Sequence, residues 1–299
     1  MNDFTVKVPA TTANLGPGLD CLGMALDIWN TLSVKIGESG IEIRGEGRDT
    51  LQNIKSNLVL TGFEAAHDSI GVPLTTVGFV CENSVPISRG LGSSAAAIVS
   101  GLVAGNHLLG DKLDNNQILK LATEIEGHPD NVAPAILGGC QIVVANEEDI
   151  LTSTIPTHPT MNAVMFIPNS SVSTKEGRSV LGGAVARVDA IHNLSRVALL
   201  VNTLRSGELS NLNIATEDRL HQPARQRVFP AMKPIMNAAT QAGALGVFLS
   251  GSGPTILALC AGRETTIGYE MAEVASKSGV DGTIKISLPS NAGAYITRK

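Results

Sequence analysis

The chain has 299 residues, enough for one large or two ordinary domains with a sizeable buried core. Hydrophobic residues make up 43% and charged residues 16%, which excludes a disordered chain. The net charge of −5, without a run of basic residues, excludes a general nucleic-acid-binding protein, because such proteins need clustered Lys and Arg.

Two further features bear on location and partners. No apolar stretch approaches the roughly 20 residues that cross a bilayer. The first residues, MNDFTVKVPATT, lack the basic start and apolar core of a signal peptide. We therefore expect a cytoplasmic protein with no membrane partner and no nucleic-acid partner.

The first part of the chain alternates between extended and helical segments. Extended segments are expected at residues 4–10, 30–36 and 75–83. The Gly-rich segment 14–23 lies between the first two, and a helix is expected over 57–71. Residues 93–109 are apolar almost all round, which predicts a buried helix that begins directly after a Gly-rich loop.

A second helix is expected over 115–126, and residues 127–146 are typical of a loop, a short helix and a strand. An acidic stretch, 146–154, then precedes a new strand at 162–168. We place the domain boundary there, with a nucleotide-binding domain at 1–155 and a C-terminal domain at 156–299.

The second part of the chain combines helices with extended runs. Helices are expected at residues 174–181, 187–206, 222–242 and 263–278. Two extended runs within 246–260 are joined by a Gly/Ser/Pro turn, and two short strands follow the last helix. The pattern predicts an α+β protein in which helices cover a largely antiparallel sheet.

The segment PISRGLGSSAAA, residues 86–97, changes abruptly from a loop to a helix N-terminus. Unpaired N–H groups and a partial positive charge at such a terminus stabilise an anion, and Gly90 and Gly92 allow close approach of the backbone. Ser93 and Ser94 add hydroxyl groups, one of which could bind Mg²⁺. The alternative is a serine N-cap without a ligand.

Two other phosphate motifs fit poorly. The Walker pattern is absent, because no Lys follows these glycines. GLGSSA resembles the dinucleotide fingerprint, but NSVPISR before it is a loop and no second strand ends in the ribose-binding acid. A Rossmann domain is therefore not expected.

Three segments in order resemble the motifs of the GHMP kinase superfamily. They are PATTANLGPGLDCLGMALD at 9–27, PISRGLGSSAA at 86–96 and SGSGPTILAL at 250–259. Within the superfamily the chain resembles the homoserine kinase family, because EGHPDNVAPAILGG, VSTKEGRSVL and DRLHQPARQRVFP match that family's further segments. The resemblance covers most of the chain.

The resemblance implies a fold and a reaction. The expected fold is the α+β GHMP kinase fold, with an N-terminal domain like domain 2 of ribosomal protein S5 and a C-terminal ferredoxin-like domain. The expected reaction transfers the γ-phosphoryl group of ATP to the side-chain hydroxyl of L-homoserine. It yields O-phospho-L-homoserine for threonine biosynthesis, with Mg²⁺ required. A homodimer is also expected.

The resemblance also assigns the nucleotide site. Ser94 and Glu126 would bind Mg²⁺ through hard oxygen atoms. Asn57 would lie near the adenine, and Gly251 and Gly253 would support the phosphate loop. The residues assigned to ATP are Pro86, Ile87, Ser88, Arg89, Gly90, Leu91, Gly92, Ser93, Ser94, Ala95, Ala96 and Asn57.

For the zwitterionic acceptor, the resemblance assigns Arg178 and Arg225 to the carboxylate and Asp20 to the ammonium group. A guanidinium fork suits bidentate pairing with a carboxylate. The full set of residues assigned to the substrate is Asn14, Asp20, His128, Asn131, Thr174, Arg178 and Arg225.

The catalytic assignments are Asn131, Glu126 and Ser94. Asn131 lies close to the reacting hydroxyl by resemblance, and an asparagine cannot accept a proton at physiological pH. The hypothesis is that Asn131 orients the hydroxyl and the γ-phosphate takes the proton. Asp130, its neighbour in the loop, is expected to point elsewhere.

Two alternatives stay open at this point. One is another kinase of the superfamily that acts on a mevalonate-like or sugar-like alcohol. The other is a non-catalytic regulator that binds ATP. A mevalonate-like or sugar-like substrate has no ammonium group and would leave Asp20 without a cationic partner. A regulator that only binds ATP would need only the Gly-rich loop before the helix at 93–109.

Overall fold

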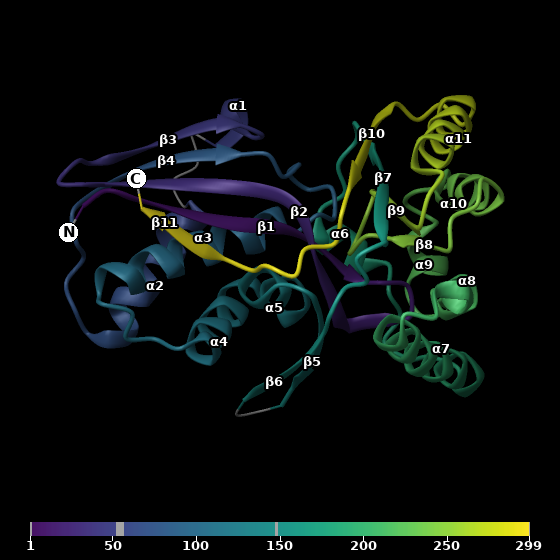
Figure 1. Ribbon diagram of the computed structural model, residues 1–299, viewed down its shortest axis with the longest axis horizontal. Helices are drawn as coiled ribbons and strands as arrows, with labels where there is room; N and C mark the ends of the chain where they lie inside the picture. Colours follow the sequence, from purple (N-terminus) through teal and green to yellow (C-terminus); the bar gives the residue numbers. More distant parts are fainter. Residues whose placement is uncertain (1, 52–56, 147–148, 299) are drawn as a thin grey trace.

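The computed structural model describes residues 2–51, 57–146 and 149–298. Two sheets lie side by side along the long axis of the molecule, each with helices packed against it (Figure 1). The first sheet has seven strands and the second has four. The predicted α+β class is confirmed, and nearly all strand pairs are antiparallel.

The first sheet is built on a long antiparallel hairpin of β1 (Phe4–Asn14) and β2 (Gly18–Ile36). The other strands are β3 (Gly40–Gly45), β4 (Val77–Asn83), β5 (Cys140–Ala145), β6 (Ile150–Ile155) and β11 (Tyr295–Arg298). β4 pairs with the second part of β2 and β5 with its first part. The predicted strand at 30–36 is therefore only the end of a longer strand.

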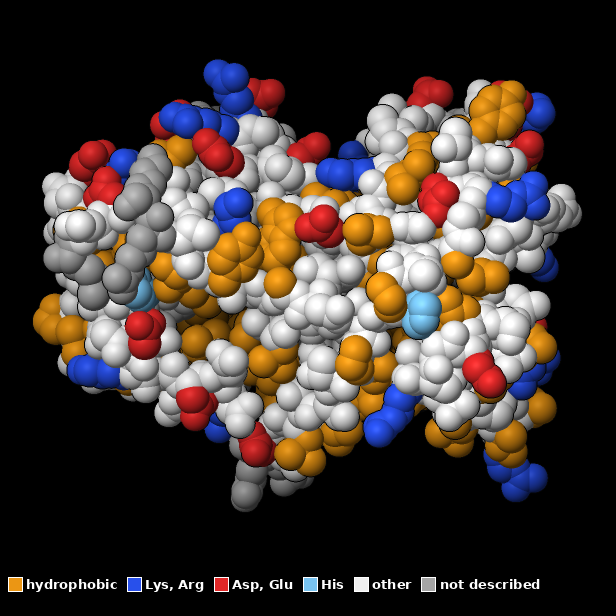
Figure 2. Space-filling view, in the orientation of Figure 1, with side chains coloured by type: hydrophobic (Ala, Val, Ile, Leu, Met, Phe, Trp, Pro, Cys, Tyr) orange, Lys and Arg blue, Asp and Glu red, His pale blue; other side chains and the backbone are white. Residues whose placement is uncertain are grey.

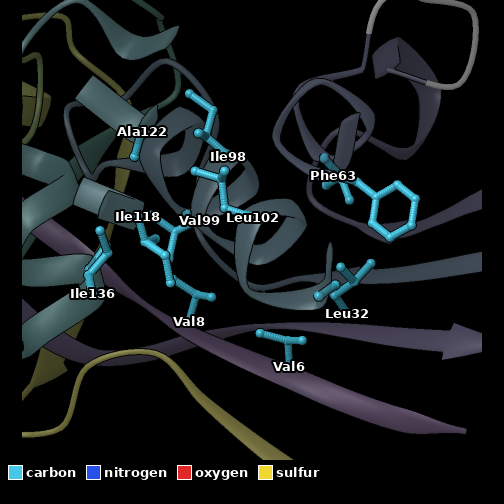
Figure 3. Packing of buried hydrophobic residues seen from close by; sticks show 14 of the residues in the cluster. Val6, Val8, Leu32, Phe63, Ile98, Val99, Leu102, Ile118, Ala122 and Ile136 are labelled. Carbon is cyan, nitrogen blue, oxygen red and sulfur yellow. The ribbon is translucent and has the colours of Figure 1, made fainter. Parts of the chain in front are cut away.

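Helices cover one face of this sheet. They are α2 (Leu58–Ile70), α3 (Ser93–Leu108), α4 (Asn115–Glu126) and α5 (Pro129–Leu137), while the short α1 (Arg48–Leu51) lies beside β3. Figure 3 shows Val6 and Val8 of β1 beneath Val99 and Leu102 of α3, and all four are buried. The predicted buried helix at 93–109 is confirmed, because it lies between the sheet and neighbouring helices.

The second sheet has the order β10-β7-β9-β8. Its strands are β7 (Asn162–Pro168), β8 (Gly246–Leu249), β9 (Ile256–Cys260) and β10 (Gly282–Ser287). The helices of this part are α6 (Thr174–Ser179), α7 (Arg187–Ser206), the 3₁₀ turn η1 (Leu209–Asn211), α8 (Leu212–Ala215), α9 (Gln222–Arg225), α10 (Met232–Gln241) and α11 (Glu264–Lys277). Ile235 of α10 and Met271 of α11 pack on Phe166 of β7 in one cluster.

A separate apolar cluster joins the two halves. Leu22 and Met24 of β2 pack in the same cluster as Met165 of β7, Leu257 of β9 and Leu204 of α7. The first part of β2 therefore belongs to a core shared with the second sheet. Burying these side chains together holds the two sheets in a fixed arrangement on either side of the candidate site.

Two features differ from the predictions. The expected helix over 222–242 is two helices, α9 and α10. Pro230 lies between them, and a continuous helix is disfavoured there because proline has no N–H group to donate a helical hydrogen bond. The chain's last strand, β11, pairs with β1 in the first sheet. The predicted division had placed everything after residue 155 in the second domain.

One face of the molecule mixes both signs of charge. On the face shown in Figure 2, Lys and Arg side chains lie among Asp and Glu side chains. Among the described residues, no helix is both long and apolar enough to cross a membrane.

Candidate active site

A cavity of about 350 Å³ lies where elements of both halves meet. Its walls come from the β1–β2 turn, the loop before α3, the ends of α4 and α6, and the loop between β8 and β9. The predicted substrate residues and Asn57, Glu126, Gly251 and Gly253 all line it. Pro86, Ala95 and Ala96 do not, because the first turn of α3 directs both alanines into the core, where they are fully buried.

The loop 87–92 reaches α3 through Gly92, which is the N-cap residue at φ +68°. Ser93 and Ser94 already belong to the helix, so the serine N-cap alternative is wrong. A Cβ on Gly92 would overlap the hydroxyl of Thr11 on β1. Glycine is thus needed both for the left-handed backbone and for close approach, and it leaves the N-terminus of α3 without a side-chain cap beside the cavity.

Residues of the second half of the chain pack against the loop 87–92. Ser250 Oγ donates a hydrogen bond to the Gly90 carbonyl at 2.6 Å. Arg89 Nε donates to the carbonyl of Pro168 at the end of β7, at 2.7 Å. A Cβ on Gly90 would overlap the carbonyl oxygen of Ser250. The segment 250–255 therefore packs directly against the loop 87–92, called the phosphate-type loop below, and restrains the backbone of that loop.

Ser94 and Glu126 meet at one wall of the cavity. Ser94 Oγ of α3 donates a hydrogen bond to Glu126 Oε1 at the end of α4, at 2.5 Å. Burial raises the pKa of the Glu126 carboxyl, and the hydrogen bond from Ser94 opposes this shift. In the described residues, no cluster of three or more His, Cys, Asp or Glu side chains could hold a metal ion. A metal ion held here would need further oxygen ligands from elsewhere, such as phosphate or water.

The start of α5 contributes three polar side chains. His128 Nδ1 lies 2.7 Å from Asp130 Oδ1. Burial lowers the pKa of His128, but the hydrogen bond and charge of Asp130 outweigh it, so that the pKa is raised overall. Asp130 is buried and lines the same cavity, which differs from the prediction that it points elsewhere. Its carboxylate contacts His128 and, at 3.4 Å, the amide nitrogen of Asn131.

Asn131 is held in one orientation by Thr11. Thr11 Oγ1 donates a hydrogen bond to Asn131 Oδ1 at 2.9 Å, and Asn131 Nδ2 lies 3.4 Å from Asp130 Oδ1. The amide oxygen of Asn131 thus accepts a hydrogen bond from Thr11, and its amide N–H₂ group faces the carboxylate of Asp130. Thr11 was not predicted as a site residue. The available signal was its place within the motif at residues 9–27, directly before the Gly-rich segment.

Asp20 and Arg178 form an ion pair across the cavity. Arg178 Nη2 donates to Asp20 Oδ1 at 2.7 Å, and Nη1 donates to Oδ2 at 3.1 Å. The backbone N–H of Asp20 donates to Asn14 Oδ1, and Asn14 Nδ2 donates to the Gly251 carbonyl. Two charges that the sequence placed 158 residues apart therefore meet, and here they satisfy one another.

Arg225 lies deeper, with only 1% of its surface exposed. Its Nε donates to the Gly177 carbonyl at 3.1 Å, and its Nη1 donates to the Gly251 carbonyl at 2.9 Å. Burial, followed by the positive charge of Arg178, lowers the pKa of Arg225 to about 10. Thr174 lines the cavity at the first turn of α6, and Asn57 caps α2 by accepting from the Val59 N–H.

Comparison with known proteins places this geometry in a family. A model of the GHMP kinase N-terminal domain matches residues 57–139, and one of the GHMP kinase C-terminal domain matches residues 200–276. The homoserine kinase of Moorella thermoacetica is 42% identical over 97% of this chain and 99% of its own length. The chain belongs to the homoserine kinase family. The homoserine kinase of Desulfitobacterium hafniense is also 42% identical, over 92% of this chain and 91% of its own length.

Solved structures agree with the family. The crystal structure of homoserine kinase from Cytophaga hutchinsonii matches 99% of this chain and 98% of its own, with a TM-score of 0.89 at 28% identity. The L. major mevalonate kinase, solved in complex with R-mevalonate, matches with a TM-score of 0.72 at 16% identity, which shows the fold alone. The expected GHMP kinase fold is thereby confirmed.

Proposed function

We propose that this protein is a homoserine kinase, which transfers the γ-phosphoryl group of ATP to the side-chain hydroxyl of L-homoserine in threonine biosynthesis. One observation carries the proposal. The N-terminus of α3, which begins after Gly92, lies in the same cavity as the carboxylate of Asp20 and the guanidinium groups of Arg178 and Arg225. These charges complement the two ends of an amino acid, and the uncapped terminus complements a triphosphate.

The nucleotide would be held mainly by backbone. The N–H groups at the start of α3 and the loop 87–92 would bind phosphate oxygens. Ser94 and Glu126 would hold Mg²⁺, which neutralises phosphate charge when bound. Their close approach supports this assignment, because both are hard oxygen donors and the half-buried Glu126 carboxylate gains from a cation.

The acceptor would be held by its two charged ends. The ammonium group would bind Asp20, and the carboxylate would bind Arg178 and Arg225. Because Asp20 and Arg178 already pair with one another, the zwitterion must replace this ion pair with two new ones. A ligand with only one charge would leave Asp20 or Arg178 without a partner, which favours an amino acid over a mevalonate-like or sugar-like alcohol.

Asn131 would orient the hydroxyl through its amide N–H₂ group, and the γ-phosphate would receive the proton. The rival base is Asp130, which is buried beside Asn131 and bonded to His128. The two roles predict opposite rankings. We expect Asn131→Ala to lose about 100-fold in kcat and Asp130→Asn about 10-fold or less. A larger loss in Asp130→Asn would show that the enzyme supplies the base.

A coupled ADP-release assay tests the proposed function directly. L-homoserine is compared with mevalonate, galactose and a buffer blank, with and without Mg²⁺. L-homoserine should exceed the other alcohols by at least about 10-fold in kcat/KM, which corresponds to about 1.4 kcal/mol of transition-state preference. Tight ATP binding without ADP release in the presence of homoserine would instead support a regulator.

A further inference from the structure

Arg225 is a buried cation whose hydrogen-bond partners carry no negative charge. Its hydrogen-bond partners are the carbonyls of Gly177 and Gly251, the hydroxyl of Ser252, and His221. In the described part of the chain, no carboxylate lies within ion-pair distance of it. Its positive charge is therefore left without a direct counterion next to the cavity. Such an arrangement is costly unless an anionic ligand completes it.

His221 is the neighbour whose protonation state the geometry defines. It is fully buried, and its Nε2 lies 2.7 Å from the carbonyl oxygen of Gly16. A carbonyl only accepts, so Nε2 carries the proton. Nδ1 then holds a lone pair and accepts a hydrogen bond from Arg225 Nη1 at 2.8 Å. This contact exists only while the imidazole is neutral, because a protonated ring would place two donors face to face.

The surroundings keep the imidazole neutral. The pKa of His221 is lowered to about 4, mainly by burial and also by the positive charge of Arg225, while the charge of Asp218 opposes the shift. The Nε2–Oδ2 distance to Asp218 is 3.7 Å, too long for a hydrogen bond. The carboxylate of Asp218 instead accepts from the backbone N–H groups of Leu220, His221 and Gln222. It thereby fixes the turn from which His221 and Arg225 project.

We propose that His221 is a positioning residue for the carboxylate end of the substrate, acting through Arg225. As a neutral acceptor it holds one edge of the guanidinium group. The Nη2 edge, beside Ser252 at the cavity wall, is left for a carboxylate. Because His221 is neutral, Arg225 has no counterion in direct contact among the described residues until that ligand binds. This inference rests on the proposed function, because it assigns the carboxylate to homoserine.

Steady-state ADP release, with homoserine and ATP varied separately, tests the assignment. His221→Leu removes the acceptor and should raise the KM for homoserine about 30-fold, while the KM for ATP stays within about 2-fold. His221→Gln retains an acceptor and a donor and should restore most of the affinity. 3-Aminopropanol is homoserine without its carboxylate. Its inhibition constant, measured against homoserine, should therefore change by less than about 2-fold in His221→Leu.

His67 offers a matched control. It is equally buried, its Nδ1 lies 3.0 Å from the Phe63 carbonyl, and it does not line the cavity. His67→Leu should lower thermal stability and leave the KM for homoserine unchanged. If His221→Leu fails to fold, His221→Glu supplies the second test, since a carboxylate beside Arg225 can keep the contact but neutralises the charge. It should raise the KM for homoserine about 10-fold.

The opposite results would overturn the inference. They are an unchanged KM for homoserine in His221→Leu or His221→Glu, equal losses for homoserine and 3-aminopropanol, or equal rises in the KM values of both substrates. The unaltered protein separates the two proposals. If it releases no ADP with homoserine, the proposed function fails and this inference fails with it, whereas failure of the inference alone appears only in the variants.

Discussion

The phosphate-type loop and the charged clamp line the same cavity but are built in different ways. The loop is a single run of backbone, residues 87–92, shaped by two glycines at positive φ, and it leads directly into α3. The clamp is made of side chains from three distant segments: Asp20 on β2, Arg178 on α6 and Arg225 on α9. The loop is thus specified by neighbouring residues, and the clamp only by the packing of both halves.

This difference predicts different responses to substitution. A change in the loop should act on the nucleotide and on the chemical step, because its backbone would contact the group that is transferred. A change in the clamp should act mainly on the KM for the acceptor. The variants below test whether the two parts are separable in this way, and each has a control residue of the same type.

Glu126→Gln should have the largest effect. Loss of the carboxylate charge removes a proposed Mg²⁺ ligand, and kcat should fall about 1,000-fold in the ADP-release assay. Glu124→Gln is the control, because Glu124 is exposed on the same helix, and it should retain full activity. Similar activities of the two variants across a Mg²⁺ titration would remove Glu126 from the nucleotide part of the site.

Gly92→Ala should lower kcat/KM for ATP about 100-fold, because the new methyl group would displace Thr11 and with it Asn131. Gly110→Ala, just after α3, is the control. Gly110 also has a positive φ, but a Cβ there meets open space. Both variants carry about 1–2 kcal/mol of backbone strain. Equal activity in the two would mean that close approach at Gly92 does not matter.

Arg225→Lys should raise the KM for homoserine about 30-fold and leave the KM for ATP within about 2-fold, because an ammonium group cannot reproduce the planar fork. Arg227→Lys, at an exposed position two residues later, should behave like the unaltered protein. Kinetic measurements with each substrate varied in turn give both constants. A parallel rise in the KM for ATP would show that clamp and loop are not separable.

The smallest effect concerns stability and pH. The pKa of His221 falls from an ordinary 6.5 to about 4 in the folded protein. As pH decreases below 6.5, the unfolded chain takes up a proton that the folded one excludes, so stability falls. His221→Gln lacks this titration. Between pH 7.5 and pH 5, urea unfolding should therefore show the unaltered protein losing on the order of 1–2 kcal/mol more than His221→Gln.

An equal pH dependence in both proteins would mean that His221 is not held neutral. His67→Gln provides the reference for replacing a buried histidine outside the site.

The elements with local signals were predicted well. The bounds of α3, α4 and α7 agree with prediction within one residue, because their periodicity and end residues lie close together in the chain. The break between α9 and α10 was missed, although Pro230 marks it. The pairing of β11 with β1 was also missed, since a strand does not encode its partner locally.

The candidate site divides in the same way. The residues assigned by resemblance lie in one cavity, apart from Pro86, Ala95 and Ala96. Two contacts were not predicted. The contact of Thr11 with Asn131 joins segments that meet only in the folded protein, and the contact of His221 with Arg225 depends on the orientation of the imidazole ring. The roles of these residues, the homodimer and the cytoplasmic location stay predictions.

The amino-acid sequence by itself determined the family, the α+β class and the phosphate-type loop, because motifs and helix signals depend on residues that are neighbours in the chain. Only the tertiary structure decided that Asp20 pairs with Arg178, that Asp130 turns to His128, and that a neutral His221 holds Arg225. Charges and hydrogen bonds act over a few ångströms in space. Their partners are therefore selected by packing across the two halves and not by distance along the chain.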